Sequence, residues 1–107
     1  MQISRKHHVR KAEAKARIDA FLDELLRREL PGGVTIKDPS KGWVGDQLQF
    51  SFKAKKGFFG ANISGVANVR ENEVGLDFDV PGIVTAFVSE ERIRETIDQQ
   101  LAVMFPE

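Results

Sequence analysis

Two adjacent histidines, His7 and His8, are the residues whose chemistry could support catalysis or metal binding. In an extended segment, neighbouring side chains point to opposite faces, so the two imidazoles cannot easily bind one ion. A zinc site needs three or four converging ligands, and the 107 residues contain no other histidine and no cysteine. A Ser–His–Asp arrangement assembled in space stays open, although no nucleophile-elbow motif supports it. We expect structural or surface roles for His7 and His8 and keep them only as secondary site candidates.

Glycines and aspartates offer no stronger chemical signature. Gly57, Gly60 and Gly65 do not match a phosphate-binding loop or a dinucleotide fingerprint, because no strand–loop–helix context surrounds them. Glycine in strands commonly marks a turn or close packing. Asp38 and Asp46 are typical of turns rather than of acid–base pairs. The sequence therefore predicts no catalytic residue, no metal and no other cofactor.

The stretch "KAKKGFFGAN", residues 53–62, combines lysines with two adjacent phenylalanines at a predicted chain reversal. Phe59 continues the apolar face of a strand, which predicts a core position. Phe58 lies in the reversal itself, and an exposed aromatic flanked by lysines is typical of an interfacial anchor. The alternative is that Phe58 folds over the sheet edge or packs under a helix end. The candidate contact with an apolar surface or a partner is formed by Phe58, Lys53, Lys55 and Lys56.

The overall composition is that of a globular domain. Hydrophobic residues make up 41% and charged residues 30% of the chain, so we expect one domain over residues 1–107. The absence of cysteine and of an apolar leader fits a cytoplasmic protein, and no run approaches the ~20 apolar residues of a membrane span. Residues 1–17 are predominantly basic and residues 70–98 predominantly acidic, although the formal net charge is zero. We interpret this uneven charge first as two charged faces exposed to water. The alternatives are attraction of nucleic acid or anionic lipid to one end, or association of two copies of the chain.

Two segments have helical periodicity. Residues 11–30 place apolar side chains at the spacing of one buried stripe: Ala14, Ile18, Phe21, Leu22, Leu25 and Leu26. The sequence "LPGG" is expected to end this helix. A second helix is predicted after Ser89, a suitable N-cap, and ends near Phe105. Its apolar stripe consists of Ile93, Ile97, Leu101 and Met104.

The middle of the chain alternates between apolar and polar residues, which predicts an antiparallel sheet. A two-residue turn at Gly45–Asp46 pairs Trp43 with Leu48 and points both inward. A turn at residues 71–72 pairs Val69 with Val74, and the pairs that follow are Ala67–Leu76, Gly65–Phe78 and Ile63–Val80. A reversal over residues 55–58 predicts Ala54–Phe59, Phe52–Ala61, Phe50–Ile63 and Leu48–Gly65. All three turns place the apolar side chains on one face.

These elements predict an α+β fold in two layers. An antiparallel sheet of four to five strands, including a short strand over residues 3–9, carries two amphipathic helices on one face, in the order β-α-β-β-β-β-α. The opposite face is polar: Gln49, Ser51, Lys53, Asn62, Ser64, Asn68, Asp77 and Asp79. Because this face offers no exposed aromatic side chains on which bases could stack, nucleic-acid binding is not expected.

The chain resembles a small bacterial family, the polyhydroxyalkanoic acid system or granule-region proteins. The opening "ISRKHHVRKAEAKARID" is similar to the family's first motif at Ile3, Arg5, His7, Glu13, Ala14, Ile18 and Asp19. The stretch "WVGDQLQFS" resembles its hairpin motif at Trp43, Gly45, Asp46, Leu48 and Phe50. "RIRETIDQQL" is similar to its terminal helix, whereas "KDPSKG" and "KAKKGFF" depart from the pattern.

The resemblance implies a non-enzymatic accessory protein of the polyhydroxyalkanoate storage system, which touches the granule surface or granule proteins. It implies no catalytic residues. A rival hypothesis is a ligand-binding or hydrolytic protein with a small cavity between the sheet and the C-terminal helix, beneath Phe78 and Ile97, where Gly65 and Ala67 leave space. A third is a homodimer joined through its opposite charges or through a sheet edge. No integral membrane contact is expected.

Overall fold

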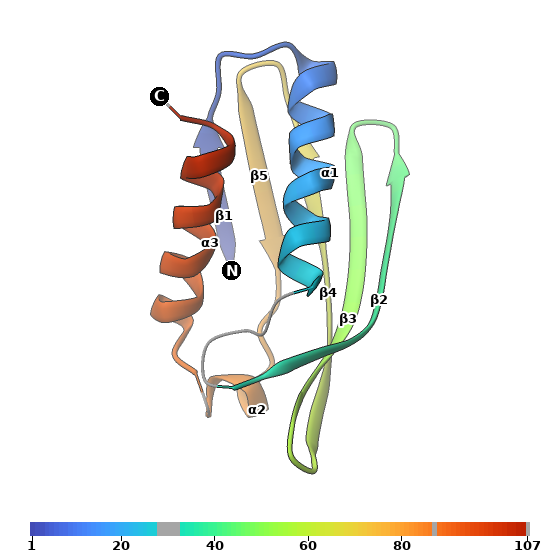
Figure 1. Ribbon diagram of the computed structural model, residues 1–107, viewed down its shortest axis with the longest axis vertical. Coiled ribbons are helices and arrows are strands. Elements are labelled where there is room, and N and C mark those ends of the chain that lie inside the picture. Colours follow the sequence, from blue (N-terminus) through green and yellow to red (C-terminus); the bar gives the residue numbers. More distant parts are fainter. Residues whose placement is uncertain (28–32, 87, 107) are drawn as a thin grey trace.

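The computed structural model describes residues 1–27, 33–86 and 88–106. Its five strands form one antiparallel sheet in the order β1-β5-β4-β3-β2, with the two long helices on one face (Figure 1). The elements are β1 (Gln2–Lys6), α1 (Lys11–Arg27), β2 (Thr35–Val44), β3 (Gln47–Lys56), β4 (Phe59–Val69), β5 (Glu73–Phe78), α2 (Gly82–Thr85) and α3 (Glu90–Met104). The predicted two-layer α+β fold and its element order are confirmed, with the single-turn helix α2 added between β5 and α3.

The helices form where the apolar stripes predict them. The buried side chains of α1 are Ala14, Ile18, Phe21 and Leu22, and those of α3 are Ile93, Ile97 and Leu101. Ser89 caps α3 as expected, since its hydroxyl accepts a hydrogen bond from the backbone N–H of Arg92 at 3.2 Å. The described part of α1 ends at Arg27, and the predicted "LPGG" stop lies mostly outside the described ranges.

The first strand is shorter than predicted and ends at Lys6 rather than at residue 9. It pairs with β5, so that Ile3 lies opposite Leu76. This pairing places the first strand at the sheet edge beside the last one. Segments more than 70 residues apart in the sequence are therefore neighbours.

Two of the three predicted turns have the predicted register. Trp43 pairs with Leu48 across the turn at Gly45, whose φ of +60° suits a turn with glycine first. Val69 pairs with Val74, Ala67 with Leu76 and Gly65 with Phe78. The ladder between β4 and β5 ends at Gly65–Phe78, so the predicted pair Ile63–Val80 lies beyond it.

The predicted register between β3 and β4 is wrong by two residues. Ala54 lies opposite Ala61 rather than Phe59, and Phe59 lies opposite Lys56. The chain reverses through Gly57 and Phe58 alone, because Gly57 adopts a φ of +62° that a two-residue turn requires. Strand β3 is consequently two residues longer at the tip than the sequence predicts, whereas β4 begins at Phe59 as expected.

The uncovered face of the sheet has the predicted polar character. Gln49, Ser51, Lys53, Asn62, Ser64, Asp77 and Asp79 are exposed, and Asn68 is half-buried. At the outer edge, β2 contains an irregularity between Lys37 and Ser40, where Asp38 has a φ of +51° and Pro39 lacks an N–H. Such interruptions make an edge a poor template for pairing with another strand.

Candidate functional site

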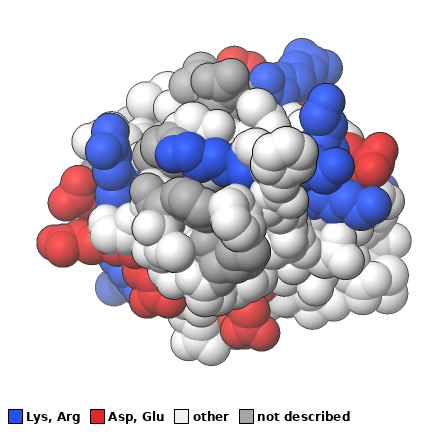
Figure 2. All heavy atoms as spheres, turned by 90° about the horizontal axis from the view of Figure 1, so that it is seen from below, with Lys and Arg blue, Asp and Glu red and all other residues white. Residues whose placement is uncertain are grey.

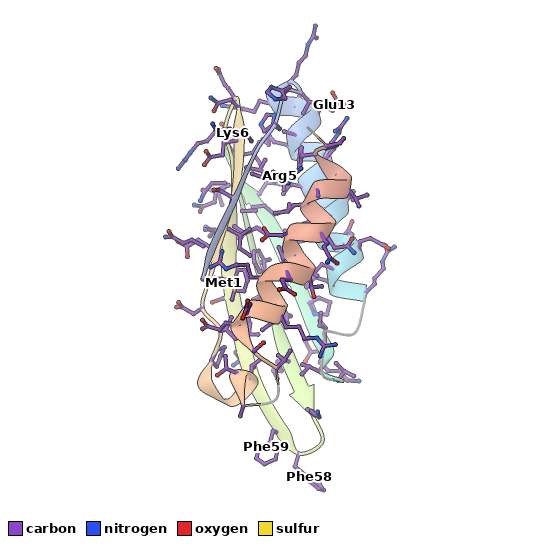
Figure 3. All side chains as sticks on the ribbon, turned by 90° about the vertical axis from the view of Figure 1, so that its left-hand side faces the viewer. Met1, Arg5, Lys6, Glu13, Phe58 and Phe59 are labelled. Carbon is purple, nitrogen blue, oxygen red and sulfur yellow. The ribbon has the colours of Figure 1, made fainter. Side chains whose placement is uncertain are left out.

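The candidate contact site lies at the tip of the hairpin formed by β3 and β4. The two strands extend beyond the helices, so the tip projects from one end of the molecule (Figure 1). Figure 3 shows Phe58 at the extreme end of the hairpin, pointing away from the body, with Phe59 beside it. The prediction of a chain reversal at this point is therefore correct, although the turn is shorter than predicted.

Both aromatic side chains at the tip are exposed to solvent. Phe58 is 108% exposed and Phe59 is 54% exposed. The prediction that Phe59 belongs to the core is wrong, because Phe59 lies opposite Lys56 at the end of the β3–β4 ladder rather than opposite Ala54. Transfer of a large apolar side chain out of water lowers the free energy. Two adjacent exposed ones therefore form a candidate surface for contact with an apolar phase or partner.

The lysines nearest the tip extend the contact site along β3. Lys53 lies on the open face opposite Lys37, and its Nζ is 3.8 Å from Asp38 Oδ2, an exposed and weak ion pair. The aliphatic stem of Lys55 lies over Gly60, with Cγ 3.5 Å from the point where a Cβ would be. Gly60 thus lets the apolar part of Lys55 add to the tip while its ammonium group stays in water.

The tip end of the hairpin is basic. Residues 35–40 and 53–60 contain four lysines and one aspartate: Lys37, Lys53, Lys55, Lys56 and Asp38. Figure 2, which looks onto this end, shows Lys and Arg side chains on either side of uncharged surface. Lys37 is a residue that the sequence did not assign to the site, because only the pairing of β2 with β3 brings it opposite Lys53.

The two histidines lie far from the tip, and their environments differ: His7 is buried and His8 is exposed. His7 is buried and its Nε2 donates a hydrogen bond to the backbone carbonyl of Arg70 at 2.8 Å. The ring centroid of His7 is 5.6 Å from that of Phe105, whereas His8 is exposed. His7 Nδ1 is buried without a hydrogen-bond partner in the described structure. His7 therefore joins β1 to the β4–β5 turn and to the end of α3.

Two arginines hold the C-terminal end of α3. Arg5 Nε donates to the carbonyl oxygen of Phe105 at 2.7 Å, and Arg17 Nη1 donates to that of Met104 at 2.8 Å. These carbonyls belong to the last turn of the helix, where backbone acceptors lack intrahelical partners and positive charge is favourable. Both arginines therefore stabilise the packing of α3 against β1 and α1.

Lys41 connects the sheet edge to α1. Its Nζ bonds Asp19, and it lies 2.7 Å from Asp23 Oδ1. Burial acts to lower the pKa of Lys41, but the hydrogen bonds and charges of the two aspartates outweigh it and raise the pKa above its usual 10.5. This ion-paired group fastens β2 to the first helix.

Asp46, in the turn between β2 and β3, forms a second connection with α1. Lys11 Nζ is 3.0 Å from Asp46 Oδ2, and Lys15 Nζ is 3.4 Å from Oδ1. The hydrogen bond from Lys11 is the main reason why the pKa of Asp46 lies below its usual 3.8. Lys15 also lies 4.9 Å from the centre of the Trp43 ring. Asp46 is thus a turn residue with a structural ion pair, as its sequence context predicts.

Within residues 1–27, 33–86 and 88–106, no three histidine, cysteine, aspartate or glutamate side chains come together in a way that could hold a metal ion. Over the same ranges, no helix has the length and apolar character needed to cross a bilayer.

Comparison with known families gives one match. The family model described as "Putative polyhydroxyalkanoic acid system protein" matches residues 1–105. The chain belongs to this family. No curated protein and no solved structure matches the chain.

The positions that carry the resemblance to the polyhydroxyalkanoic acid system family maintain its fold. In the first motif, Ile3, Ala14 and Ile18 are buried, while Arg5 and His7 hold the end of α3 and the β4–β5 turn. In the second motif, the turn residues and core residues close the β2–β3 hairpin: Trp43, Gly45, Asp46, Leu48 and Phe50.

Proposed function

We propose that this chain is a non-enzymatic, cytoplasmic accessory protein of the bacterial polyhydroxyalkanoate storage system that contacts the polyester granule surface through its β3–β4 tip. Membership of the polyhydroxyalkanoic acid system family supports the biological context. The observation that carries the contact is the complete exposure of Phe58 at the end of a projecting hairpin. The exposed half of Phe59 enlarges the apolar surface.

The physical basis of the contact is the transfer of aromatic rings out of water. Burying a phenylalanine side chain is worth about 1.5–3 kcal/mol relative to leaving it exposed. Each ring that enters the polyester would therefore strengthen binding by about tenfold or more. Lys53, Lys55 and Lys56 can keep their ammonium groups in water at the rim while their stems lie on the apolar surface. Hydroxyacid polymers end in carboxylates, which these ammonium groups can attract.

A non-enzymatic role is supported by the environment of the reactive side chains. His7 is buried and bonds a backbone carbonyl, and Arg5 and Arg17 donate hydrogen bonds to the carbonyls of Phe105 and Met104 at the end of α3. These side chains hold the helices and the sheet together. The tip, with its exposed phenylalanines and lysines, is the surface that we assign to the contact.

The test is co-sedimentation of the purified protein with isolated granules and with protein-free polyester particles. We expect the wild-type protein to sediment with both, and Phe58→Asp to reduce the bound fraction at least tenfold. Val44→Asp is the matched control, because Val44 is also exposed (62%) but lies at the end of β2, opposite Gln47 and away from the tip. Equal loss of binding in both variants would contradict a contact at the tip. Binding to granules but not to protein-free particles would replace the polyester surface with a granule protein as the partner.

A salt series separates the roles of the rings and the lysines. Lys55→Glu combined with Lys56→Glu should weaken binding at low salt, and the difference from wild type should shrink at high salt as charges are screened. The effect of Phe58→Asp should persist at high salt, because burial of an apolar ring is not screened. A deficit of the lysine variant that does not change with salt would contradict the electrostatic role.

A further inference from the structure

The core contains an apolar cavity of about 40 Å³ between the sheet and the helices. It is lined by Leu22, Leu25, Phe50, Phe52, Ile63, Leu76, Phe78, Val80, Val84, Ile93 and Ile97. The position is the one expected from the sequence for a ligand cavity, beneath Phe78 and Ile97. The expected cause is different, because the space does not arise at Gly65 or Ala67. Ala67 is fully buried, and a Cβ on Gly65 would lie 2.5 Å from that of Phe78.

The chemical character of the cavity excludes a polar occupant. Among the residues that the structure describes, all of the lining side chains are aliphatic or aromatic. A buried water needs two to four polar partners, whereas dry apolar cavities accept apolar guests. The lining therefore favours hydrocarbon over water or a charged group.

Three aromatic side chains that line the cavity retain some exposure to solvent. Phe50, Phe52 and Phe78, which form its floor on the sheet, retain 7%, 8% and 9% exposure. Leu48 and Leu101, which do not line the cavity, retain 0% and 1%.

The cavity is larger than the ~30 Å³ share of a water molecule but smaller than the ~150 Å³ cavity that binds benzene. A ligand of several carbons consequently requires the lining to move outward. Arg17 fastens α1 to the C-terminal end of α3, whereas Ile93 and Ile97 line the cavity from the other half of α3. This half is held to β1 by an exposed hydrogen bond, from Arg94 Nη1 to the carbonyl oxygen of Gln2 at 3.0 Å. Outward movement of this half, with the Arg17–Met104 end fixed, would break that bond and enlarge the cavity.

We propose that this cavity binds the unbranched alkyl chain of a neutral ligand, with displacement of the N-terminal half of α3. The inference rests on the lining, the residual exposure and the position of the hydrogen bond to α3. Only the natural source of the alkyl chain rests on the proposed function. That source would be a hydroxyalkanoyl unit with an alkyl side chain.

The direct test is a titration of the full chain with hexanol, octanol and decanol, followed by methyl nuclear magnetic resonance. We expect shifts of the methyl signals of Val84, Ile93 and Ile97 that saturate. Affinity should increase about fourfold with each added methylene until the enlarged cavity is full, because each buried methylene contributes a constant increment. Saturating decanol without shifts at these methyl groups would overturn the proposal.

Two conservative variants test the available space. Val84→Ile adds one methylene next to the cavity, so it should raise the melting temperature and weaken decanol binding at least tenfold. Val74→Ile adds the same group at a fully buried position that does not line the cavity, so it should lower the melting temperature and leave decanol binding unchanged. A decrease in melting temperature for both variants, or unaltered decanol binding in Val84→Ile, would overturn the proposal.

A third variant separates this inference from the proposed granule contact. Phe58→Asp should bind decanol like the wild-type protein, because the tip lies outside the cavity lining. Loss of granule binding with intact decanol binding is the expected result and supports both proposals. Intact granule binding in Phe58→Asp would contradict the granule contact and would leave the cavity proposal standing. Weakened decanol binding in Phe58→Asp would contradict the cavity as the binding site.

Discussion

Arg17 on α1 donates a hydrogen bond from Nη1 to the carbonyl oxygen of Met104, the last residue of α3, at 2.8 Å. Its other terminal nitrogen, Nη2, is 2.8 Å from Glu13 Oε1 in the preceding turn of the same helix. One guanidinium therefore orients itself within α1 and fastens the end of α3 across the molecule. The contact with α3 is the one that links the two helices over the sheet.

This geometry predicts that the two hydrogen bonds of Arg17 contribute unequally to the free energy of unfolding. Arg17→Ala should lower the free energy of unfolding by about 1–2 kcal/mol, because it removes a charge-assisted hydrogen bond to a helix terminus. Glu13→Gln removes only the exposed i,i+4 pair and should cost about 0.3–0.5 kcal/mol. Urea unfolding of both variants measures the difference, and equal losses would show that the contact with Met104 contributes nothing.

Gly65 is a position where the packing of two aromatic side chains excludes any larger residue. A Cβ there would lie 2.5 Å from Phe78 Cβ, 2.6 Å from Asp77 O and 2.9 Å from Phe50 Cζ. Gly65→Ala should destabilise the protein by about 3 kcal/mol, at the upper end of the usual cost of overpacking, because backbone is among the obstacles. Thermal or urea unfolding gives the value.

Gly75→Ala is the control for that substitution, since its Cβ would meet only Ile3 O at 3.9 Å. Without a clash, alanine in a strand should leave stability unchanged or raise it by about 0.5–1 kcal/mol. A loss at Gly75 as large as that at Gly65 would indicate a general effect of removing glycine from the sheet.

Because of Lys41, we expect the free energy of unfolding to decrease as pH rises through the alkaline range. Its pKa is raised in the folded protein by Asp19 and Asp23, so the contribution of the ion pair is fully present below the usual value of 10.5 and is lost as pH rises through the folded pKa. Between about pH 9 and about pH 12 the wild-type protein should lose more unfolding free energy than Lys41→Met. Parallel pH profiles for the two proteins would contradict this linkage.

The sequence predicts most of the fold because its strongest signals are local. The apolar stripes of α1 and α3, the cap at Ser89 and the glycine-first turn at Gly45 each depend on a few neighbouring residues, and each is confirmed. Contacts between distant segments were not predictable in the same way. Arg5 and Phe105 are 100 residues apart, and no periodic pattern connects them.

The register error at the β3–β4 turn has a specific physical reason. A shift by one residue would have turned every apolar side chain to the wrong face, but a shift by two preserves the faces. The alternation of Phe50, Phe52 and Ala54 against Ile63 and its neighbours is therefore equally satisfied by both registers. The deciding factor is the positive φ of Gly57, which allows a two-residue turn.

The candidate site was predicted in part for the same reason. Phe58 occupies the reversal in both registers, so its place at the tip followed from the sequence alone. Phe59 was predicted to lie in the core opposite Ala54, but in the structure it lies opposite Lys56 and is 54% exposed. Lys37 could not be assigned, because the irregularity at Asp38 and Pro39 alters the alternation of β2.

Phe59 provides a decisive test of the observed register. A core phenylalanine typically costs about 3–5 kcal/mol when it is replaced by alanine, because both burial and packing are lost. At 54% exposure and opposite Lys56, Phe59→Ala should cost less than about 1 kcal/mol, whereas Phe52→Ala, at 8% exposure on the same hairpin, should cost the full amount. Urea unfolding measures both on one scale. A loss at Phe59 equal to that at Phe52 would support the register with Phe59 opposite Ala54, and would remove Phe59 from the contact site.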